Sequence, residues 1–160
     1  MKTDFKTLLN KLSDNNFEFI LIGGFAASVY GSSYVTHYLD ICAVLTPGNI
    51  EKLRNILSDL HPKHRITVNK PSFLEIPEEL EGINNLYLET DAGVLDFISN
   101  VIGVGDFLEL SKNAIEIKIF GRICKIISLD DLIKTKTTLK RPKDILVAEE
   151  LEIIRKRNKK

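Results

Sequence analysis

The sequence predicts an α+β fold in which one mixed β-sheet packs against helices. Short apolar runs at 17–22 and 39–45 suit buried strands, and apolar residues at helical spacing lie between and after them. Two later pairs of apolar segments, at 86–99 and 115–127, each surround a glycine-containing turn and favour hairpins. Hairpins interrupt the regular strand–helix alternation of a doubly wound parallel sheet, so a mixed sheet is expected.

The first half of the chain predicts three helices and two strands. Asp4 is placed to cap a first helix, and Thr46 followed by Pro47 is typical of a helix beginning at that proline. A short helix is expected at 25–30, between the glycine pair at 23–24 and Gly31. The apolar faces of the first and third helices consist of Phe5, Leu8, Leu9, Leu12 and of Ile50, Leu53, Leu57, Leu60.

The second half predicts two hairpins followed by two helices. A short strand is expected at 66–68 and a proline-rich loop at 71–78. The first hairpin pairs 86–90 with 94–99 around a three-residue loop at 91–93, and the second turns at Gly121. Ser128 begins a capping box for a helix to about Leu139, and the last helix covers 143–157.

Composition is that of a globular protein. The 160 residues are 44% hydrophobic and 28% charged, which favours a single domain spanning 1–160. No apolar run approaches the roughly 20 residues of a membrane span, so no membrane partner is expected. Cys42 and Cys124 lack metal-ligand spacing and are expected to be buried thiols of a cytoplasmic protein. Ten basic and four acidic residues at 134–160 give that segment six positive charges in excess.

Three features could carry chemistry. Gly23 and Gly24 lie between a strand and a helix, where glycine lets a ligand approach the backbone and the helix N-terminus attracts anions. Asp40 and Asp96 each lie in an apolar strand, where a carboxylate needs a compensating partner such as a divalent cation. Each feature also has a structural interpretation: glycines are common in tight turns, and a strand-end aspartate can reach water.

In order and spacing, these features resemble the signature of the polymerase-beta-like nucleotidyltransferase superfamily, most closely its small bacterial members. In that signature a strand, a glycine turn, a short helix and an acid-bearing strand are followed by a third acid on a later strand. The sequence FILIGG at 19–24, YLDI at 38–41 and Asp96 match these parts. The likeness continues through IISLDDLI at 126–133, Lys136 and RPKD at 141–144, and so covers most of the chain.

The resemblance implies a nucleotidyltransferase fold and a reaction. Asp40 and Asp96, on strands expected to be neighbours, would be the catalytic acids and would hold Mg²⁺ or Mn²⁺, while Gly23 and Gly24 would cradle the phosphates of a nucleoside triphosphate. Further contacts to the nucleotide are expected from Ser32, Ser33 and Lys136. The nucleoside monophosphate would pass to an acceptor that the sequence leaves open among proteins, RNA and small molecules such as aminoglycosides.

The sequence departs from the signature at two positions. The first acid of the metal-binding pair should stand two residues before Asp40, where this chain has Tyr38, and a neutral phenol is a poor Mg²⁺ ligand. The usual arginine before Thr36 is replaced by Tyr34. With a three-residue hairpin loop, Glu89 would point away from Asp96 and could not substitute, whereas a two-residue loop would reverse that conclusion.

Three functions therefore remain open from the sequence. The first is a metal-dependent nucleotidyltransferase, an enzyme whose catalysis Tyr38 would impair. The second is a catalytically weakened nucleotide-binding or protein-interaction module on the same fold, such as a toxin–antitoxin component. The third is a nucleic-acid-binding protein that uses the basic C-terminal segment, although no cluster of aromatic residues for base stacking accompanies that charge.

Overall fold

The sheet that organises the molecule has seven strands in the order β3-β4-β5-β2-β1-β9-β8. The computed structural model of this chain describes residues 2–75 and 83–159. Both parallel and antiparallel neighbours occur, so the sheet is mixed as predicted. The strands are β1 (Ile20–Ile22), β2 (Tyr38–Cys42), β3 (Lys63–His64), β4 (Asn85–Thr90), β5 (Gly93–Ile98), β8 (Ile115–Ile119) and β9 (Arg122–Ile126), and β6 (Asn100–Val101) and β7 (Gly105–Asp106) form a separate ribbon.

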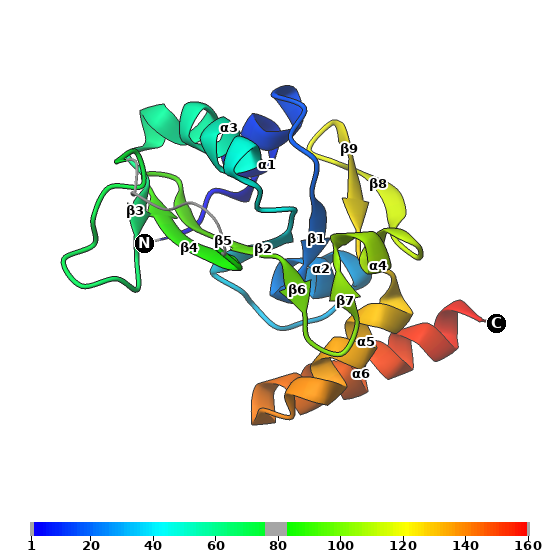
Figure 1. Cartoon of the computed structure of the whole chain (residues 1–160). Coiled ribbons are helices and arrows are strands. Elements are labelled where there is room, and N and C mark those ends of the chain that lie inside the picture. The colour runs from blue at the N-terminus through cyan, green and yellow to red at the C-terminus, as the bar shows by residue number, and fades with distance from the viewer. Residues whose placement is uncertain (1, 76–82, 160) are drawn as a thin grey trace.

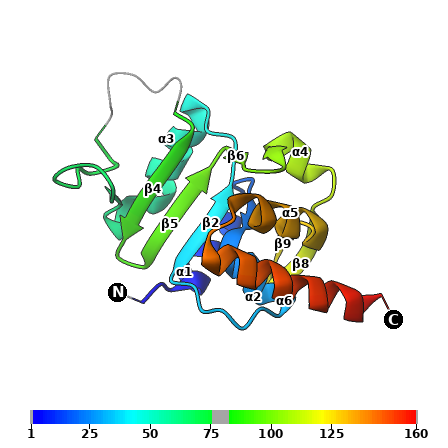
Figure 2. The same cartoon turned by 90° about the horizontal axis from the view of Figure 1, so that it is seen from below.

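Helices lie on both faces of the sheet. In Figure 1, α1 and α3 lie above the sheet, and α2, α5 and α6 lie below it, which the view from below in Figure 2 confirms. Leucines and isoleucines of these helices and of the central strands form one hydrophobic core that extends from Leu8 to Leu151. The helices are α1 (Phe5–Asp14), α2 (Gly23–Tyr30), α3 (Pro47–Leu57), the 3-10 turn η1 (Ser58–Leu60), α4 (Phe107–Ser111), α5 (Leu129–Leu139) and α6 (Pro142–Asn158).

The predicted helix starts are confirmed by their capping hydrogen bonds. The side chains of Asp4, Thr46 and Ser128 each accept a hydrogen bond from the backbone N–H three residues later, which satisfies one of the donors that a helix start leaves unpaired. Gly31 ends α2 in the left-handed conformation, with a φ of 114°. Among the described residues, no helix combines the length and apolarity needed to span a bilayer.

The sequence predictions need correction at several elements. The strand expected at 66–68 is wrong: Ile66 and Val68 lie exposed in a turn, and the strand β3 lies earlier in the chain, at Lys63–His64. The ribbon of β6 and β7 and the helix α4 were not predicted, because such short elements carry too few residues for a periodic pattern. The strands expected at 17–22 and 39–45 are shorter than predicted, and part of the loop expected at 71–78 falls outside the described residues.

The correction that matters for the site concerns the β4–β5 hairpin. Its loop has two residues, Asp91 and Ala92, because Thr90 pairs with Gly93, whose φ of 117° suits only glycine. Tyr87 therefore lies opposite Asp96, where the three-residue loop had placed Leu88. The same shift turns Glu89 to the face that carries Asp96.

Register across the sheet places four polar residues side by side. Asp40 on β2 pairs with Asp96 on β5, and Asp96 pairs with Tyr87 on β4. Arg65, directly after β3, donates its backbone N–H to the carbonyl of Tyr87 at 3.0 Å and so continues the row. Side chains that are opposite one another on neighbouring strands leave the same face of a sheet, so all four point to the side on which α5 and α6 lie.

Candidate functional site

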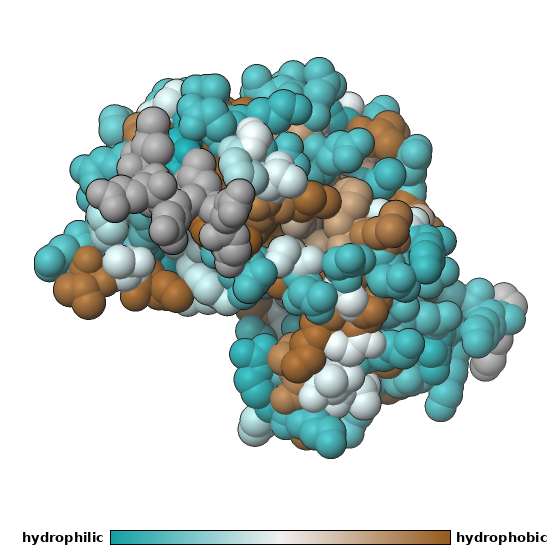
Figure 3. Space-filling view, viewed as in Figure 1, coloured by the Kyte–Doolittle hydropathy of each residue, from teal (hydrophilic) through white to brown (hydrophobic). Residues whose placement is uncertain are grey.

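A cleft of about 770 Å³ separates the β2–β5–β4 part of the sheet from α5 and α6. In Figure 3 the outline of the molecule is notched between the body that carries the sheet and the lobe formed by these helices. A volume of this size is within the range of roughly 300–1,000 Å³ for small-molecule sites. Its polar lining residues are Thr36, Tyr38, Asp40, Arg65, Tyr87, Asp96, Thr135, Lys136, Arg141, Lys143 and Asp144.

The glycine turn forms one wall of the cleft and leaves room for Asp40. Gly23 has a φ of 68°, and a Cβ there would approach the Cβ of Asp40 to 2.9 Å and its carboxylate more closely still. A Cβ on Gly24 would lie 2.9 Å from the Cβ of Thr36. The turn therefore needs glycine for close packing, and the N-terminus of α2, which no described side chain caps, opens into the cleft.

Asp40 is a largely buried carboxylate without a hydrogen-bond partner among the described residues. Burial raises the pKa of Asp40 to about 6, and the charge of Asp96 adds to the rise. The cations of Lys136, Arg65 and Lys143 offset part of that effect. An unpaired acid in this position is available to bind a ligand.

Asp96, by contrast, is buried and paired with Arg65. The Nε of Arg65 donates to Oδ1 of Asp96 at 3.1 Å, and its Nη2 donates to Oδ2, which makes a bidentate ion pair. Burial raises the pKa of Asp96, and these hydrogen bonds offset part of the rise. The same pairing raises the pKa of the Arg65 guanidinium.

Two tyrosine rings hold the guanidinium of Arg65. Its Cζ lies 5.0 Å from the ring centroid of Tyr38 and 5.5 Å from that of Tyr87, both within cation–π distance. Tyr38 stands at the position where the signature has an acid, and it is 47% exposed at the cleft. Its aromatic face therefore contacts a cation that belongs to the protein.

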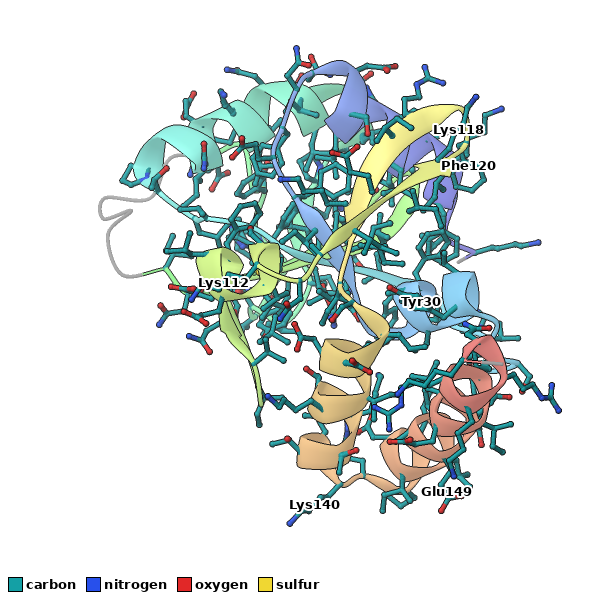
Figure 4. All side chains as sticks on the ribbon, turned by 90° about the vertical axis from the view of Figure 1, so that its right-hand side faces the viewer. Tyr30, Lys112, Lys118, Phe120, Lys140 and Glu149 are labelled. Atoms are coloured by element: carbon teal, nitrogen blue, oxygen red, sulfur yellow. The ribbon has the colours of Figure 1, made fainter. Side chains whose placement is uncertain are left out.

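The helical wall of the cleft is basic. Asp144, buried at the start of α6, accepts hydrogen bonds from Lys136 at 3.4 Å and from Nε of Arg141 at 2.5 Å. Burial opposes its ionisation, but these two cations hold the pKa of Asp144 below its ordinary value. Lys143 also lines this wall, whereas Lys140, at the turn between α5 and α6, points away from the molecule in Figure 4. In all, four basic and three acidic side chains line the cleft, an excess of one positive charge.

Ser32 and Ser33 do not line the cleft. Both hydroxyls donate to the carboxylate of Glu150 on α6 at 2.6 Å, and the backbone N–H of Ser33 donates to it at 3.0 Å. In this conformation the two serines connect the α2–β2 loop to the last helix, so their expected contact with a nucleotide has no geometric support. Of the nucleotide-binding residues expected from the sequence, Gly23, Gly24 and Lys136 are the ones brought together.

The donor set falls short of an ordinary Mg²⁺ site. Asp40 and Asp96 lie on neighbouring strands as expected, but both oxygens of Asp96 accept hydrogen bonds from Arg65. Glu89 shares their face but lies outside the cleft lining, in an ion pair with Lys70 at 3.1 Å. No group of three or more His, Cys, Asp or Glu side chains within 2–75 and 83–159 is arranged to bind a metal. Mg²⁺ or Mn²⁺ therefore stays a prediction.

Sequence reasoning missed Arg65 and Tyr87. Arg65 follows a two-residue strand in a turn-rich segment, where no pattern marks it, and it meets Asp96 from 31 positions away. Tyr87 was missed because the hairpin loop was taken one residue too long. One signal was available: a buried mid-strand aspartate needs a cationic partner, and an arginine is the residue best suited to bind it in a bidentate way.

Comparisons with known proteins support the fold. No protein-family model matches the sequence, and no curated protein sequence matches it either. The structure is similar to that of the lincosamide antibiotic adenylyltransferase LnuA in its lincomycin-bound form, with a TM-score of 0.64 and 17% sequence identity. The match covers 96% of this chain and 99% of that enzyme. The chain therefore has a nucleotidyltransferase-like fold, with a mixed sheet and C-terminal helices.

Proposed function

We propose that this protein transfers a nucleoside monophosphate from a nucleoside triphosphate to an acceptor hydroxyl bound in the same cleft. The observation that carries the proposal is the unpaired carboxylate of Asp40, which lies against the glycine turn and faces a basic helical wall. The similarity to an adenylyltransferase over nearly the whole chain supports the same reaction class.

The triphosphate is bound between the two walls. The N–H groups at the start of α2 carry a partial positive charge and suit phosphate oxygens. Lys136 and Arg141 are fixed by the buried Asp144, and Lys143 adds a third cation on that side. These groups neutralise the charge that accumulates on the phosphates as the bond breaks.

The chemical step needs one proton acceptor. The acceptor oxygen forms a bond to the α-phosphorus, and the bond from that phosphorus to the bridging oxygen of the leaving group breaks, so that pyrophosphate departs with the bonding electrons. The hydroxyl proton passes to the carboxylate of Asp40, which has no other partner among the described residues. Positioning by the cleft and its charges supplies the rest of the rate enhancement.

The acceptor is proposed to be a small hydroxyl-bearing molecule. The cleft is enclosed on one side by the sheet and on the other by α5, which gives it the size of a small-molecule site. Its lining mixes apolar side chains such as Ile98 and Leu139 with the charged ones, which suits a molecule that is only partly polar. Because LnuA is a lincosamide antibiotic adenylyltransferase, lincosamides are the first acceptors to test, and aminoglycosides are the second.

The experiment measures transfer of label from each of the four α-³²P-labelled nucleoside triphosphates to lincosamides, aminoglycosides, RNA and the protein itself. A labelled product is expected with the wild-type protein and not with Asp40→Asn. Asp130→Asn is the matched control, because this aspartate is exposed on α5 and pairs with Arg155 outside the cleft. Absence of a labelled product with every acceptor would refute the proposal, and saturable nucleotide binding without transfer would then indicate a catalytically weakened module.

A further inference from the structure

Arg65 occupies the part of the cleft where the resemblance leads one to expect a metal ion. The signature gathers acids of two neighbouring strands around a cation, and in this chain the cation next to Asp96 is a guanidinium. Its position is set by backbone pairing, because the N–H of Arg65 bonds to the carbonyl of Tyr87 and extends the β3–β4 ladder. The sheet therefore fixes the backbone beside β4 from which the guanidinium reaches Asp96.

Tyr38 in place of an acid and Arg65 in place of a metal ion fit each other. An acid at position 38 would help to bind a metal ion, whereas the ring of Tyr38 offers a face to a guanidinium at 5.0 Å. Tyr87 offers a second ring at 5.5 Å, and the side chain of Arg65 is only 20% exposed. An arginine exposed on the surface would make none of these contacts, and the phenol of Tyr38 is a poor ligand for a metal ion.

We propose that Arg65 is a resident cation that takes the place of a divalent ion, so that the cleft binds the phosphates of its ligand without Mg²⁺. The inference rests on the proposed function for the identity of that ligand, a nucleoside triphosphate. Asp96 binds through Nε and Nη2 of Arg65, and Nη1 has no partner in the described part of the chain. The N–H groups of Nη1 can therefore donate hydrogen bonds to a phosphate oxygen on the side of the cleft opposite Lys136 and Arg141.

The first test measures Mn²⁺ binding by electron paramagnetic resonance in the absence of nucleotide. Arg65→Met keeps an unbranched side chain between the two rings but removes the charge and frees Asp96. We expect Arg65→Met to bind Mn²⁺ at least about tenfold more tightly than the wild type. Arg122→Met is the matched control, since Arg122 makes the same bidentate contact with Asp14, with both N–O distances at 2.9 Å, away from the cleft.

The second test measures binding of inorganic tripolyphosphate by calorimetry, with EDTA and then with Mg²⁺. The wild type and Arg122→Met should bind equally well in both conditions, and Arg65→Met should bind at least about tenfold more weakly in EDTA. Arg65→Lys keeps the charge but loses the bidentate geometry, so it should weaken tripolyphosphate binding by less than Arg65→Met does. It replaces Arg65→Met in this test if that variant does not fold.

Two results would overturn the inference: tripolyphosphate binding by the wild type that requires Mg²⁺, or Mn²⁺ affinity that Arg65→Met leaves unchanged. Both measurements are independent of any acceptor and of turnover. Failure of nucleotidyl transfer in the labelling experiment would therefore refute the proposed function while the Mn²⁺ and tripolyphosphate results still decide the role of Arg65.

Discussion

Replacing Asp40 by asparagine should stabilise the free protein at neutral pH. Asp40 is a half-buried carboxylate beside a second acid, and its pKa rises from 3.8 to about 6. A shift of about 2 units corresponds to roughly 3 kcal/mol between the protonated and the ionised form. The ionised carboxylate is therefore a cost to folding that an isosteric amide avoids.

The sign of the effect depends on pH. Below pH 3.8 the carboxyl is protonated in the folded and the unfolded chain, so Asp40 contributes no pH dependence. Between pH 3.8 and about 6 the folded state holds more protons than the unfolded state, and the free energy of unfolding falls as pH rises. Above about pH 6 the full penalty is present, so the advantage of Asp40→Asn should grow from near zero at acid pH to at most about 3 kcal/mol at pH 8.

Urea unfolding of both proteins at a series of pH values from 4 to 8 measures this difference, because subtracting the two curves removes the titration of every group that does not interact with Asp40. Asp144→Asn is the control of opposite sign: Arg141 and Lys136 lower the pKa of Asp144, so that variant should lose stability at pH 8. A stability difference between the wild type and Asp40→Asn that is the same at pH 4 and pH 8 would refute the reasoning.

Three further predictions concern the cleft and its supports. Tyr38→Asp in an Arg65→Met background should raise Mn²⁺ affinity by roughly two decades over the wild type, measured by calorimetry, because the missing acid is then restored and the guanidinium beside Asp96 is removed. Equal affinities would mean that no metal site can be restored. Gly24→Ala should lower the free energy of unfolding, measured in urea, by about 1–3 kcal/mol, because its Cβ would lie 2.9 Å from the Cβ of Thr36. It should also weaken tripolyphosphate binding. If stability and binding are both unchanged, the turn has room for a side chain. Ser128→Ala should cost about 1 kcal/mol of stability through the lost cap of α5, and a change in tripolyphosphate binding would contradict its assignment as a purely structural residue.

Local signals in the sequence predicted the frame of the site well. Capping residues such as Thr46 and Ser128 bond to backbone groups only three positions away, so the pattern and the structure agree at helix starts. The strands of Asp40 and Asp96 were expected to be neighbours from the resemblance, and the sheet pairs these two residues directly. Such features depend on short-range contacts or on a shared fold.

Long-range contacts limited the rest of the prediction. Gly93 fits either a two-residue or a three-residue hairpin loop, and a shift of one residue exchanges the faces of β4, which brought Tyr87 into the cleft and Glu89 to the side of Asp96. Arg65 reaches the site through sheet pairing of a short strand, for which the sequence holds no periodic signal. Ser32 and Ser33 were expected at the nucleotide because they follow the glycine turn, and only the fold shows that Glu150 binds them.

The hydrogen bonds between Glu150 and the two serines connect the last helix to the surroundings of the cleft at a second place, beyond its first turn. Lys143 and Asp144, in the first turn of α6, line the cleft directly, and Glu150, two turns later, fixes the loop that leads to Thr36 and Tyr38. A chain shortened to end before Glu150 would release that loop, although it would keep every residue that lines the cleft. A chain shortened after Leu151 would keep the bond to the serines but would lose Ile154, which packs against the core, and the ion pair between Arg155 and Asp130. The position of the loop that leads to Thr36 and Tyr38 therefore depends on Glu150, a residue that does not line the cleft.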